Sequence, residues 1–345
     1  MRTRSRDKGA TMTSRTIAVL GATGAVGLKM LEVLAERRFP AREIRALASP
    51  RSAGVEVPFG NEKLRVQAVT ASAFEGVDIA LFSAGAGPSR EWAPIAAAKG
   101  ACVIDNSSAW RMDDDVPLCV PEVNLDAARV RPKGIIANPN CSTIQMLVAL
   151  APLHRAARIR RIVVSTYQAI SGAGAQSVDH FRQQASAFAA GQPMPKGPIT
   201  KQLAGNLLME WKRDVSVGYQ EEELKMVHET RKILGDAAMR ISPTTVRVPV
   251  INAHAESIAV EFERPMHQAE ARALLAKAPG VKLMDDFAQG VYPTPRDADG
   301  LDDVLVGRIR DDLGNPGGIM LWVVSDNLRK GAATNAVQIA EGLFL

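Results

Sequence analysis

Cys141 is the residue of this chain best placed to act as a nucleophile. It lies in the segment NPNCST at 138–143, which follows a short apolar run and opens a helical pattern that ends near Leu153. The N-terminus of a helix favours a thiolate over a thiol and offers free backbone N–H groups to an oxyanion. We therefore predict covalent thiol chemistry at Cys141. The alternative is that this cysteine only fills space in the core, as free cysteines commonly do.

The other two cysteines lack that setting. Cys102 and Cys119 stand among apolar neighbours and are expected to be small buried hydrophobic residues. Three cysteines cannot make a disulfide framework, and no Cys or His spacing in the chain is typical of a zinc site. We predict no bound metal.

A second candidate site is the glycine-rich segment GATGAVG at 21–27. It follows the apolar run 16–20 and opens a helical pattern. In this context small residues let backbone N–H groups approach a pyrophosphate at the positive end of a helix. The alternative is a tight strand-to-helix turn with no ligand. The residues predicted to bind a dinucleotide here are Gly21, Thr23, Gly24, Ala25, Val26 and Gly27.

The end of the second predicted strand indicates which dinucleotide is bound. NAD sites commonly place Asp or Glu there, about 20 residues after the glycines, to accept a hydrogen bond from the ribose. Here the strand 44–48 is followed by Ser49, Arg51 and Ser52 and by no acid. Two hydroxyls and a guanidinium suit a 2′-phosphate, so we predict NADP. The alternative is that Arg51 is an ordinary solvated residue.

The composition indicates a folded protein large enough for two cores. The chain has 345 residues, of which 46% are hydrophobic and 23% charged, and single cores stop growing near about 250–300 residues. The net charge of +5 is spread along the chain, which favours small anionic ligands over nucleic acid. No apolar run approaches the roughly 18 residues of a membrane helix. We expect a soluble, cytoplasmic protein with no membrane or nucleic-acid partner.

The order of the apolar patterns predicts two parts of different construction. Strand patterns at 16–20, 44–48, 77–82 and 101–104 alternate with helical patterns, which indicates a parallel, doubly wound sheet. Beyond residue 140, longer segments alternate between apolar and polar residues, as in antiparallel strands that face water on one side. The strands expected there are 158–167, 246–248, 255–263, 304–310 and 319–325, and the helices are 142–153, 173–189 and 332–345, the last after a break at Gly331.

Residues 1–15 precede this pattern. They are rich in Arg, Ser and Thr, and Met12 stands just before the first strand. We expect a disordered arm over 1–15, or an alternative start at Met12, rather than a transit peptide.

Five motifs, taken in order, resemble those of aspartate-semialdehyde dehydrogenase. They are GATGAVG at 21–27, DNSSAWR at 105–111, NPNCST at 138–143, YQAISGAG at 167–174 and EELK at 222–225. The resemblance implies an NADP-dependent, phosphorylating aldehyde oxidoreductase. Such enzymes reductively dephosphorylate L-aspartyl 4-phosphate to L-aspartate 4-semialdehyde with NADPH, in the biosynthesis of lysine, methionine, threonine and diaminopimelate.

The resemblance also implies an α/β fold like that of glyceraldehyde-3-phosphate dehydrogenase. A Rossmann-like NADP-binding domain is expected at 16–140 and is completed by 327–345. A catalytic and dimerisation domain of α+β type is expected at 141–326. Family members are homodimers or homotetramers, and the sequence does not choose between them.

The proposed chemistry suits a thiol. A thiolate adds to an aldehyde, and the hemithioacetal can lose a hydride to nicotinamide and leave a thioester that phosphate attacks. By the resemblance Cys141 is this nucleophile and Gln168 orients the intermediate. His254 matches the acid/base position, a task that suits imidazole near neutral pH.

Charged residues match the charged parts of the substrate. By the resemblance Arg247 binds the α-carboxylate, Glu222 receives the ammonium, and Arg111 and Lys225 bind the phosphate. Taken alone, the acidic run 221–223 is typical of a solvated helix face. Trp110 stands where the family more often has phenylalanine, which leaves the role of Arg111 unchanged. The further residues expected to line the cofactor cleft are Ser83, Ala84, Gly85, Asn106, Ser171, Gly172 and Asn327.

The motifs argue against three alternatives. N-acetyl-glutamyl-phosphate reductase shares the architecture and the thioester chemistry, but its cysteine motif typically reads HPGCY, and Glu222 here offers a partner for a free ammonium. Glyceraldehyde-3-phosphate dehydrogenase carries an SCTTN motif that this chain lacks. A nucleotide-sensing module without catalysis would lack a nucleophile or a base, and neither is missing.

Overall fold

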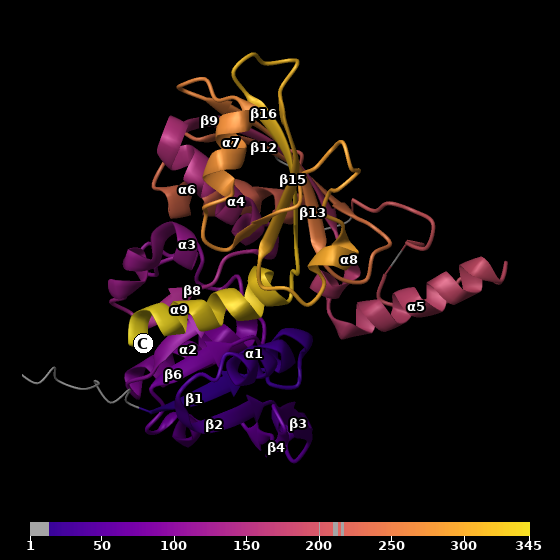
Figure 1. Ribbon diagram of the computed structural model, residues 1–345. Coiled ribbons are helices and arrows are strands. Elements are labelled where there is room, and N and C mark those ends of the chain that lie inside the picture. The colour runs from indigo at the N-terminus through magenta and orange to yellow at the C-terminus, as the bar shows by residue number, and fades with distance from the viewer. Residues whose placement is uncertain (1–13, 200, 210–212, 215–216) are drawn as a thin grey trace, which may run out of the picture.

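Two six-stranded sheets, each with its own helices, dominate the structure (Figure 1). A computed structural model describes residues 14–199, 201–209, 213–214 and 217–345. An arm was predicted for residues 1–15, of which 1–13 lie outside the described residues. Its predicted boundary is wrong, because Arg15 already belongs to the first strand.

The first sheet is parallel throughout, with the strand order β5-β2-β1-β6-β7-β8. Its strands are β1 (Arg15–Leu20), β2 (Ala41–Ala48), β5 (Gln67–Ala68), β6 (Ile79–Phe82), β7 (Cys102–Asp105) and β8 (Ile135–Ala137). The strand order reverses between β1 and β6. In open α/β sheets such a switch point is where ligands bind, at the carboxyl ends of the strands.

Helices cover both faces of this sheet. Ile17 and Val19 of β1 pack in one apolar cluster with α1 (Ala25–Glu36) and α9 (Thr334–Phe344), whereas Ala18 and Leu20 pack in the cluster that contains α2 (Ala86–Ala98). Burial on both faces explains why these strands read as continuous apolar runs. The predicted doubly wound sheet is confirmed.

The second sheet is mixed, with the strand order β12-β9-β13-β16-β15-β14. Its strands are β9 (Ile159–Gln168), β12 (Arg240–Arg247), β13 (His254–Phe262), β14 (Val281–Leu283), β15 (Val304–Asp311) and β16 (Ile319–Ser325). The three central pairings are antiparallel and the two edge pairings are parallel. The strand predicted at 246–248 is too short, because Pro243 and the polar residues around it hide the alternation of β12.

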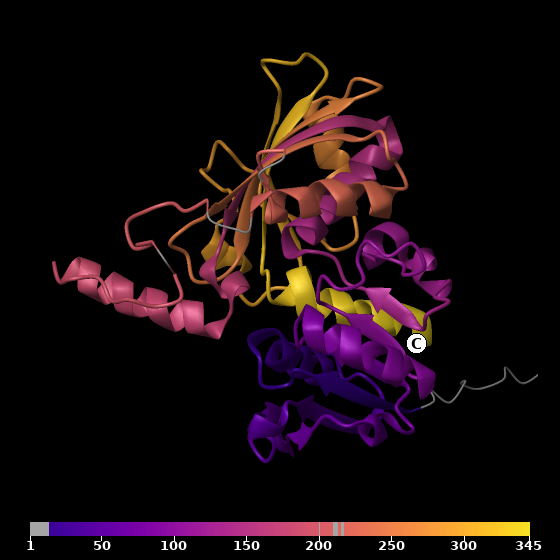
Figure 2. The ribbon, with the colours of Figure 1, turned by 180° about the vertical axis from the view of Figure 1, so that it is seen from behind.

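Three helices cover one face of the second sheet, and the short α8 (Pro295–Ala298) packs on the opposite face against β16. In Figure 1, α4 (Cys141–Ala157), α6 (Glu221–Leu234) and α7 (Gln268–Leu275) lie on the same side of it. On the opposite face Tyr167 is 37% exposed and its ring lies 5.3 Å from that of Trp322. Helix α5 (Ala175–Ala189) projects away from both sheets, as Figure 1 and Figure 2 show.

The end of the chain returns to the first sheet. A π-helical turn at Arg329–Ala333 leads directly into α9, which packs on α1. The break predicted at Gly331 is therefore wrong. Gly331 lies inside the turn, where an added Cβ would come within 2.9 Å of the Cys141 Cβ, so this turn holds the backbone close to the cysteine.

Smaller elements complete the fold. They are β3 (Glu56–Phe59), β4 (Glu62–Arg65), α3 (Pro121–Asn124), β10 (Arg213–Asp214), β11 (Tyr219–Gln220) and α8 (Pro295–Ala298). Among the residues that the structure describes, none of the helices has the length and apolar character that a bilayer span requires.

Candidate active site

A cavity of about 760 Å³ lies between the two sheets. It is bounded by the carboxyl end of the first sheet, by the ends of three adjacent strands of the second sheet and by the N-terminal half of α6. The predicted site residues that line it are Gly24, Ala25, Val26, Ser83, Asn106, Arg111, Cys141, Gln168, Ser171, Gly172, Glu222, Lys225, Arg247, His254 and Asn327. The predicted residues outside its lining are Gly21, Thr23, Gly27, Ser49, Arg51, Ser52, Ala84 and Gly85.

Cys141 is the first residue of α4, as predicted. Asn140 caps the helix through its Oδ1, which accepts from the backbone N–H of Ser142 at 3.0 Å and of Thr143 at 3.4 Å. Cys102 and Cys119 are buried in the core of the first domain, also as predicted. Cys141 is the only cysteine of the three that lines the cavity.

The ionisation of Cys141 differs from the prediction. Burial, followed by the negative charge of Glu222, raises the pKa of the Cys141 thiol to about 12, although Arg247, Arg111 and the Ser142 N–H act in the opposite direction. The expectation that the helix N-terminus lowers this pKa is therefore wrong for the substrate-free chain. A helix terminus contributes only a partial charge, and here it is outweighed by desolvation and a full carboxylate.

This raised pKa predicts a steep pH dependence of thiol modification. Between pH 7 and pH 10 the thiolate fraction grows roughly tenfold per pH unit, because the thiolate is the reactive form and its pKa lies above this range. The rate of Cys141 alkylation by iodoacetamide, followed by peptide mass spectrometry, should rise accordingly and show no plateau. A plateau beginning near neutral pH would show that Cys141 is already ionised in the free protein.

Three polar side chains meet where strands of the second sheet end. Arg247 is the last residue of β12 and pairs in register with Gln168, the last residue of β9. His254 is the first residue of the neighbouring strand, β13. An added Cβ at Gly172 would come within 3.3 Å of both Arg247 Nη1 and His254 Nε2, so the loop after β9 lies directly against this group.

His254 is buried in a defined tautomer. The backbone N–H of Ala169 donates to its Nδ1 at 2.9 Å. Because a backbone N–H can only donate, Nδ1 must accept, and the neutral ring then carries its proton on Nε2. Nε2 lacks a hydrogen-bond partner among the described residues. Burial and then the charge of Arg247 hold the pKa of His254 well below its ordinary value, so the ring is neutral.

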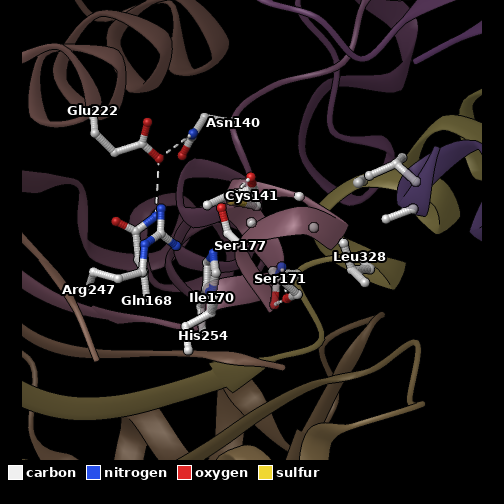
Figure 3. Close-up of a pocket in the computed structure, with 18 of the residues that line it drawn as sticks. Asn140, Cys141, Gln168, Ile170, Ser171, Ser177, Glu222, Arg247, His254 and Leu328 are labelled. Carbon is white, nitrogen blue, oxygen red and sulfur yellow. Dashed lines mark hydrogen bonds between the residues drawn. The ribbon is translucent and has the colours of Figure 1, made fainter. Parts of the chain in front are cut away.

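Glu222 connects the cysteine loop to the second sheet (Figure 3). Its Oε1 accepts from Asn140 Nδ2 at 2.8 Å and from Gln168 Nε2 at 3.1 Å, and Lys225 Nζ lies 3.3 Å from its Oε2. Burial opposes its charge, but these partners and Arg247 lower the pKa of Glu222. With only 7% of its surface exposed, Glu222 is not part of a solvated helix face.

Arg111 reaches the cavity from the loop after β7. Its Nη1 lies 2.9 Å from Glu229 Oε1, a buried partner on α6. Asn140 and Glu229 are site residues that were not predicted from the sequence. Asn140 could have been found as the N-cap before the cysteine, and Glu229 as the residue that lies two helical turns beyond Glu222 on the same face.

The glycine turn has the backbone form that a dinucleotide requires. Gly21 has a φ of +89°, and an added Cβ there would overlap the carbonyl of Ser83 across the switch point. An added Cβ at Gly27 would overlap the carbonyl of Gly21. No side chain of the described residues caps the N-terminus of α1, and its first turn has no acid. The backbone N–H groups are thus open to a pyrophosphate, and the site fits a dinucleotide.

The residues predicted to select NADP lie at the end of β2. Arg51 belongs to a short 3₁₀ turn, Pro50–Ser52, and both Ser49 and Arg51 are exposed. Three of the other residues predicted to line the cofactor cleft are held by hydrogen bonds: Asn327 Nδ2 donates to Ser171 Oγ at 2.9 Å, and Asn138 Nδ2 donates to Asn106 Oδ1 at 2.7 Å. The described residues contain no group of three or more His, Cys, Asp or Glu that could hold a metal ion.

Comparisons with known proteins agree with this architecture. The family model for the semialdehyde dehydrogenase NAD binding domain matches residues 16–130, and the model for the semialdehyde dehydrogenase dimerisation domain matches residues 150–330. An aspartate-semialdehyde dehydrogenase of Aquifex aeolicus (strain VF5) is 52% identical over 94% of this chain and 96% of that relative.

Two solved structures are also similar. Aspartate semialdehyde dehydrogenase II of Vibrio cholerae, complexed with ASA, is 49% identical with a TM-score of 0.93 and covers 96% of this chain and 98% of that one. The aspartate semialdehyde dehydrogenase of Candida albicans, with NADP, is 25% identical with a TM-score of 0.73 and covers 96% of this chain and 98% of that one.

Proposed function

The chain belongs to the aspartate-semialdehyde dehydrogenase family, and we propose that it converts L-aspartyl 4-phosphate to L-aspartate 4-semialdehyde with NADPH. It is an oxidoreductase of amino-acid biosynthesis, in the pathways to lysine, methionine, threonine and diaminopimelate. One observation carries the substrate assignment: Glu222 and Arg247 both line the cavity of Cys141. A carboxylate and a guanidinium beside one thiol suit an amino acid whose ammonium and carboxylate are both free.

In this proposal Cys141 is the nucleophile. Its sulfur attacks the acyl carbon of the aspartyl phosphate, the C–O bond to phosphate breaks, and a thioester remains. When bound, the nicotinamide supplies the hydride that reduces an acyl group to an aldehyde. The tetrahedral oxyanion then expels the Cys141 sulfur and releases the semialdehyde.

His254 and Gln168 are proposed to act on the reacting group. The Nε2–H of His254 is free of protein partners among the described residues and faces the cavity, where it can donate to the substrate oxygen as negative charge develops. We assign the acid/base role to His254 on this basis. Gln168 Nε2 is already held by Glu222 at 3.1 Å, which supports a role in orienting the intermediate.

Ionisation of the thiol would follow substrate binding. The negative charge of Glu222 raises the pKa of Cys141, even with Lys225 Nζ 3.3 Å from Glu222 Oε2. An ammonium bound at Glu222 would neutralise that charge and lower the pKa of the thiol. The lysine and the two arginines of the cavity are proposed for the anions: Arg247 for the α-carboxylate, Arg111 and Lys225 for the phosphate.

We propose NADP as the cofactor, held by the glycine turn and by Ser49, Arg51 and Ser52. Replacement of Arg51 by alanine should weaken the binding of NADP by about 10- to 100-fold and the binding of NAD by less than about twofold. Only NADP carries the 2′-phosphate that a guanidinium can bind. The dissociation constants of both nucleotides, measured by quenching of protein fluorescence, check this. Equal weakening would mean that Arg51 does not contact the 2′-phosphate.

The assembly and the domain limits are also proposals. We propose a homodimer built on the face of the second sheet that α4, α6 and α7 leave uncovered, around Tyr167, and a homotetramer remains the alternative. We assign 16–140 with 327–345 to the cofactor domain, supported by the contact of α9 with α1, and 141–326 to the catalytic domain. A cytoplasmic location remains a prediction from the sequence.

A substrate comparison tests the function. The protein should reduce NADP in the presence of phosphate and aspartate semialdehyde. With N-acetylglutamate semialdehyde the rate should be at least about 100-fold lower, because its acylated nitrogen cannot pair with Glu222. Preference for the acetylated substrate would assign the chain to the reductase alternative instead.

A further inference from the structure

Glu229 is a buried carboxylate with two functional neighbours. It lies on α6, and only 1% of its surface is exposed. Its Oε1 accepts from Arg111 Nη1 at 2.9 Å, and its Oε2 accepts from the backbone N–H of Asn140 at 2.7 Å. One carboxylate thus joins the cation proposed for phosphate to the residue that precedes the nucleophile.

The other contacts of Arg111 fix the direction of its remaining donors. Its Nε donates to the Ser107 carbonyl at 3.1 Å, and its Nη2 donates to the Asn106 carbonyl at 2.9 Å. Together with Glu229 these partners engage three of the five N–H groups of a guanidinium. One N–H on each Nη remains for the cavity that Arg111 lines. A pair of N–H groups in fixed positions is what bidentate phosphate binding requires.

The backbone of the Arg111 loop is held by the same helix. Lys232, one turn beyond Glu229, donates through Nζ to the carbonyls of Arg111 at 2.8 Å, Asp113 at 2.7 Å and Val116 at 2.9 Å. Helix α6 therefore fixes both the main chain and the side chain of Arg111. It also carries Glu222 and Lys225, so the phosphate and ammonium positions share one rigid element.

We propose that Glu229 is a positioning residue for phosphate: it holds Arg111 and the Asn140–Cys141 loop in one geometry, so that the phosphate leaves or enters beside the sulfur. This inference rests on the proposed function for the identity of the anion. A positioning role and a purely charge-neutralising role of Glu229 predict opposite changes in phosphate affinity. If Glu229 only neutralised Arg111, removal of its charge would strengthen the binding of phosphate, whereas loss of positioning weakens it.

Two substitutions separate these effects. In Glu229→Asp the charge is kept, but the shorter side chain cannot reach both Arg111 and Asn140. In Glu229→Gln the shape is kept, but the amide NH₂ would face either the guanidinium or the Asn140 N–H, both of which are donors. We expect both variants to bind inorganic phosphate at least about tenfold more weakly than the wild type.

Phosphate binding can be measured without turnover. Inorganic phosphate should protect Cys141 from iodoacetamide, and the concentration for half-protection, read by mass spectrometry at constant ionic strength with sodium chloride, gives the affinity. In parallel, the KM of phosphate should rise at least about tenfold in the oxidative assay, while the KM of aspartate semialdehyde changes less than about twofold. Combined with Arg111→Ala, the Glu229 substitutions should add almost nothing to the loss of phosphate affinity, since Glu229 acts on bound phosphate through Arg111.

Glu223→Gln is the matched control. Glu223 is another buried carboxylate of α6, and it accepts from the backbone N–H groups of Gln220 at 2.9 Å and Thr245 at 3.0 Å without touching Arg111. Its substitution should reduce thermal stability as the Glu229 substitutions do and leave the half-protecting phosphate concentration unchanged.

The outcomes distinguish this inference from the proposed function. Unchanged or stronger phosphate protection in both Glu229 variants, or effects that add to those of Arg111→Ala, would overturn the positioning role. Absence of protection by phosphate in the wild type would overturn it as well. Failure of the wild type to oxidise aspartate semialdehyde, with protection weakened in both variants as expected, would overturn the proposed substrate and leave the role of Glu229 intact.

Discussion

Replacement of Cys141 by alanine should lower turnover by at least about 10⁴-fold, because the proposed acyl intermediate forms on its sulfur. Of the three cysteines, all of which the structure describes, Cys141 alone lines the cavity, and it is the first residue of α4. NADP affinity should change less than about twofold, since Cys141 lies at the start of α4 and not in the glycine turn. Steady-state kinetics and nucleotide titration of the same preparation check both expectations.

Cys102→Ala is the control for this substitution. Cys102 is 7% exposed and packs in the apolar cluster of the first domain. Cys102→Ala removes the same thiol group as Cys141→Ala. It should lower the free energy of unfolding and leave turnover unchanged. Residual activity of Cys141→Ala above a few per cent of the wild type would exclude a thioester route, and so would the absence of an acyl adduct on Cys141 in enzyme quenched during turnover.

Replacement of Glu222 by glutamine should have two effects of opposite sign. Turnover of aspartate semialdehyde, measured as kcat/KM, should fall by about 10²- to 10³-fold, because the buried ammonium of the substrate loses its charged partner. Alkylation of Cys141 by iodoacetamide, an uncharged reagent, should become faster at neutral pH. The charge of Glu222 raises the pKa of Cys141, so its removal lowers that pKa and increases the thiolate fraction.

The adjacent Glu221 provides the comparison for this prediction. Its side chain is 45% exposed and pairs with Lys225 at 3.1 Å, whereas that of Glu222 is buried. Glu221→Gln should therefore leave the alkylation rate nearly unchanged. Slower alkylation in Glu222→Gln would show that Glu222 does not act on the thiol through its charge, and unchanged kcat/KM would show that it does not bind the ammonium.

The features that the sequence predicted best are local ones. The glycine turn and the position of Cys141 at the start of α4 each depend on residues within one short segment of the chain. Their backbone conformations follow from short-range sterics, from glycine at Gly21 with its φ of +89°, and from apolar periodicity. The strand β12 was predicted too short and the helix α6 was not predicted, because the polar residues of both elements conceal the periodicity of their buried faces.

The site itself depends on contacts between distant segments. Arg247 and Gln168 become neighbours through the pairing of β12 with β9, and Glu229 meets Arg111 across 118 residues of chain. No spacing in the sequence encodes these distances, because they arise from how α6 and the two sheets pack.

The sequence by itself determined which side chains were available: one thiol at a helix N-terminus, a glycine turn without an acid partner for ribose, and a set of cations and acids. Tertiary structure decided how these groups behave. It reversed the expected shift of the Cys141 pKa, because burial and the charge of Glu222 outweigh the helix terminus. It also fixed the tautomer of His254 through Ala169. Ionisation and proton position respond to desolvation and to charges a few ångströms away, and only the folded chain sets those distances.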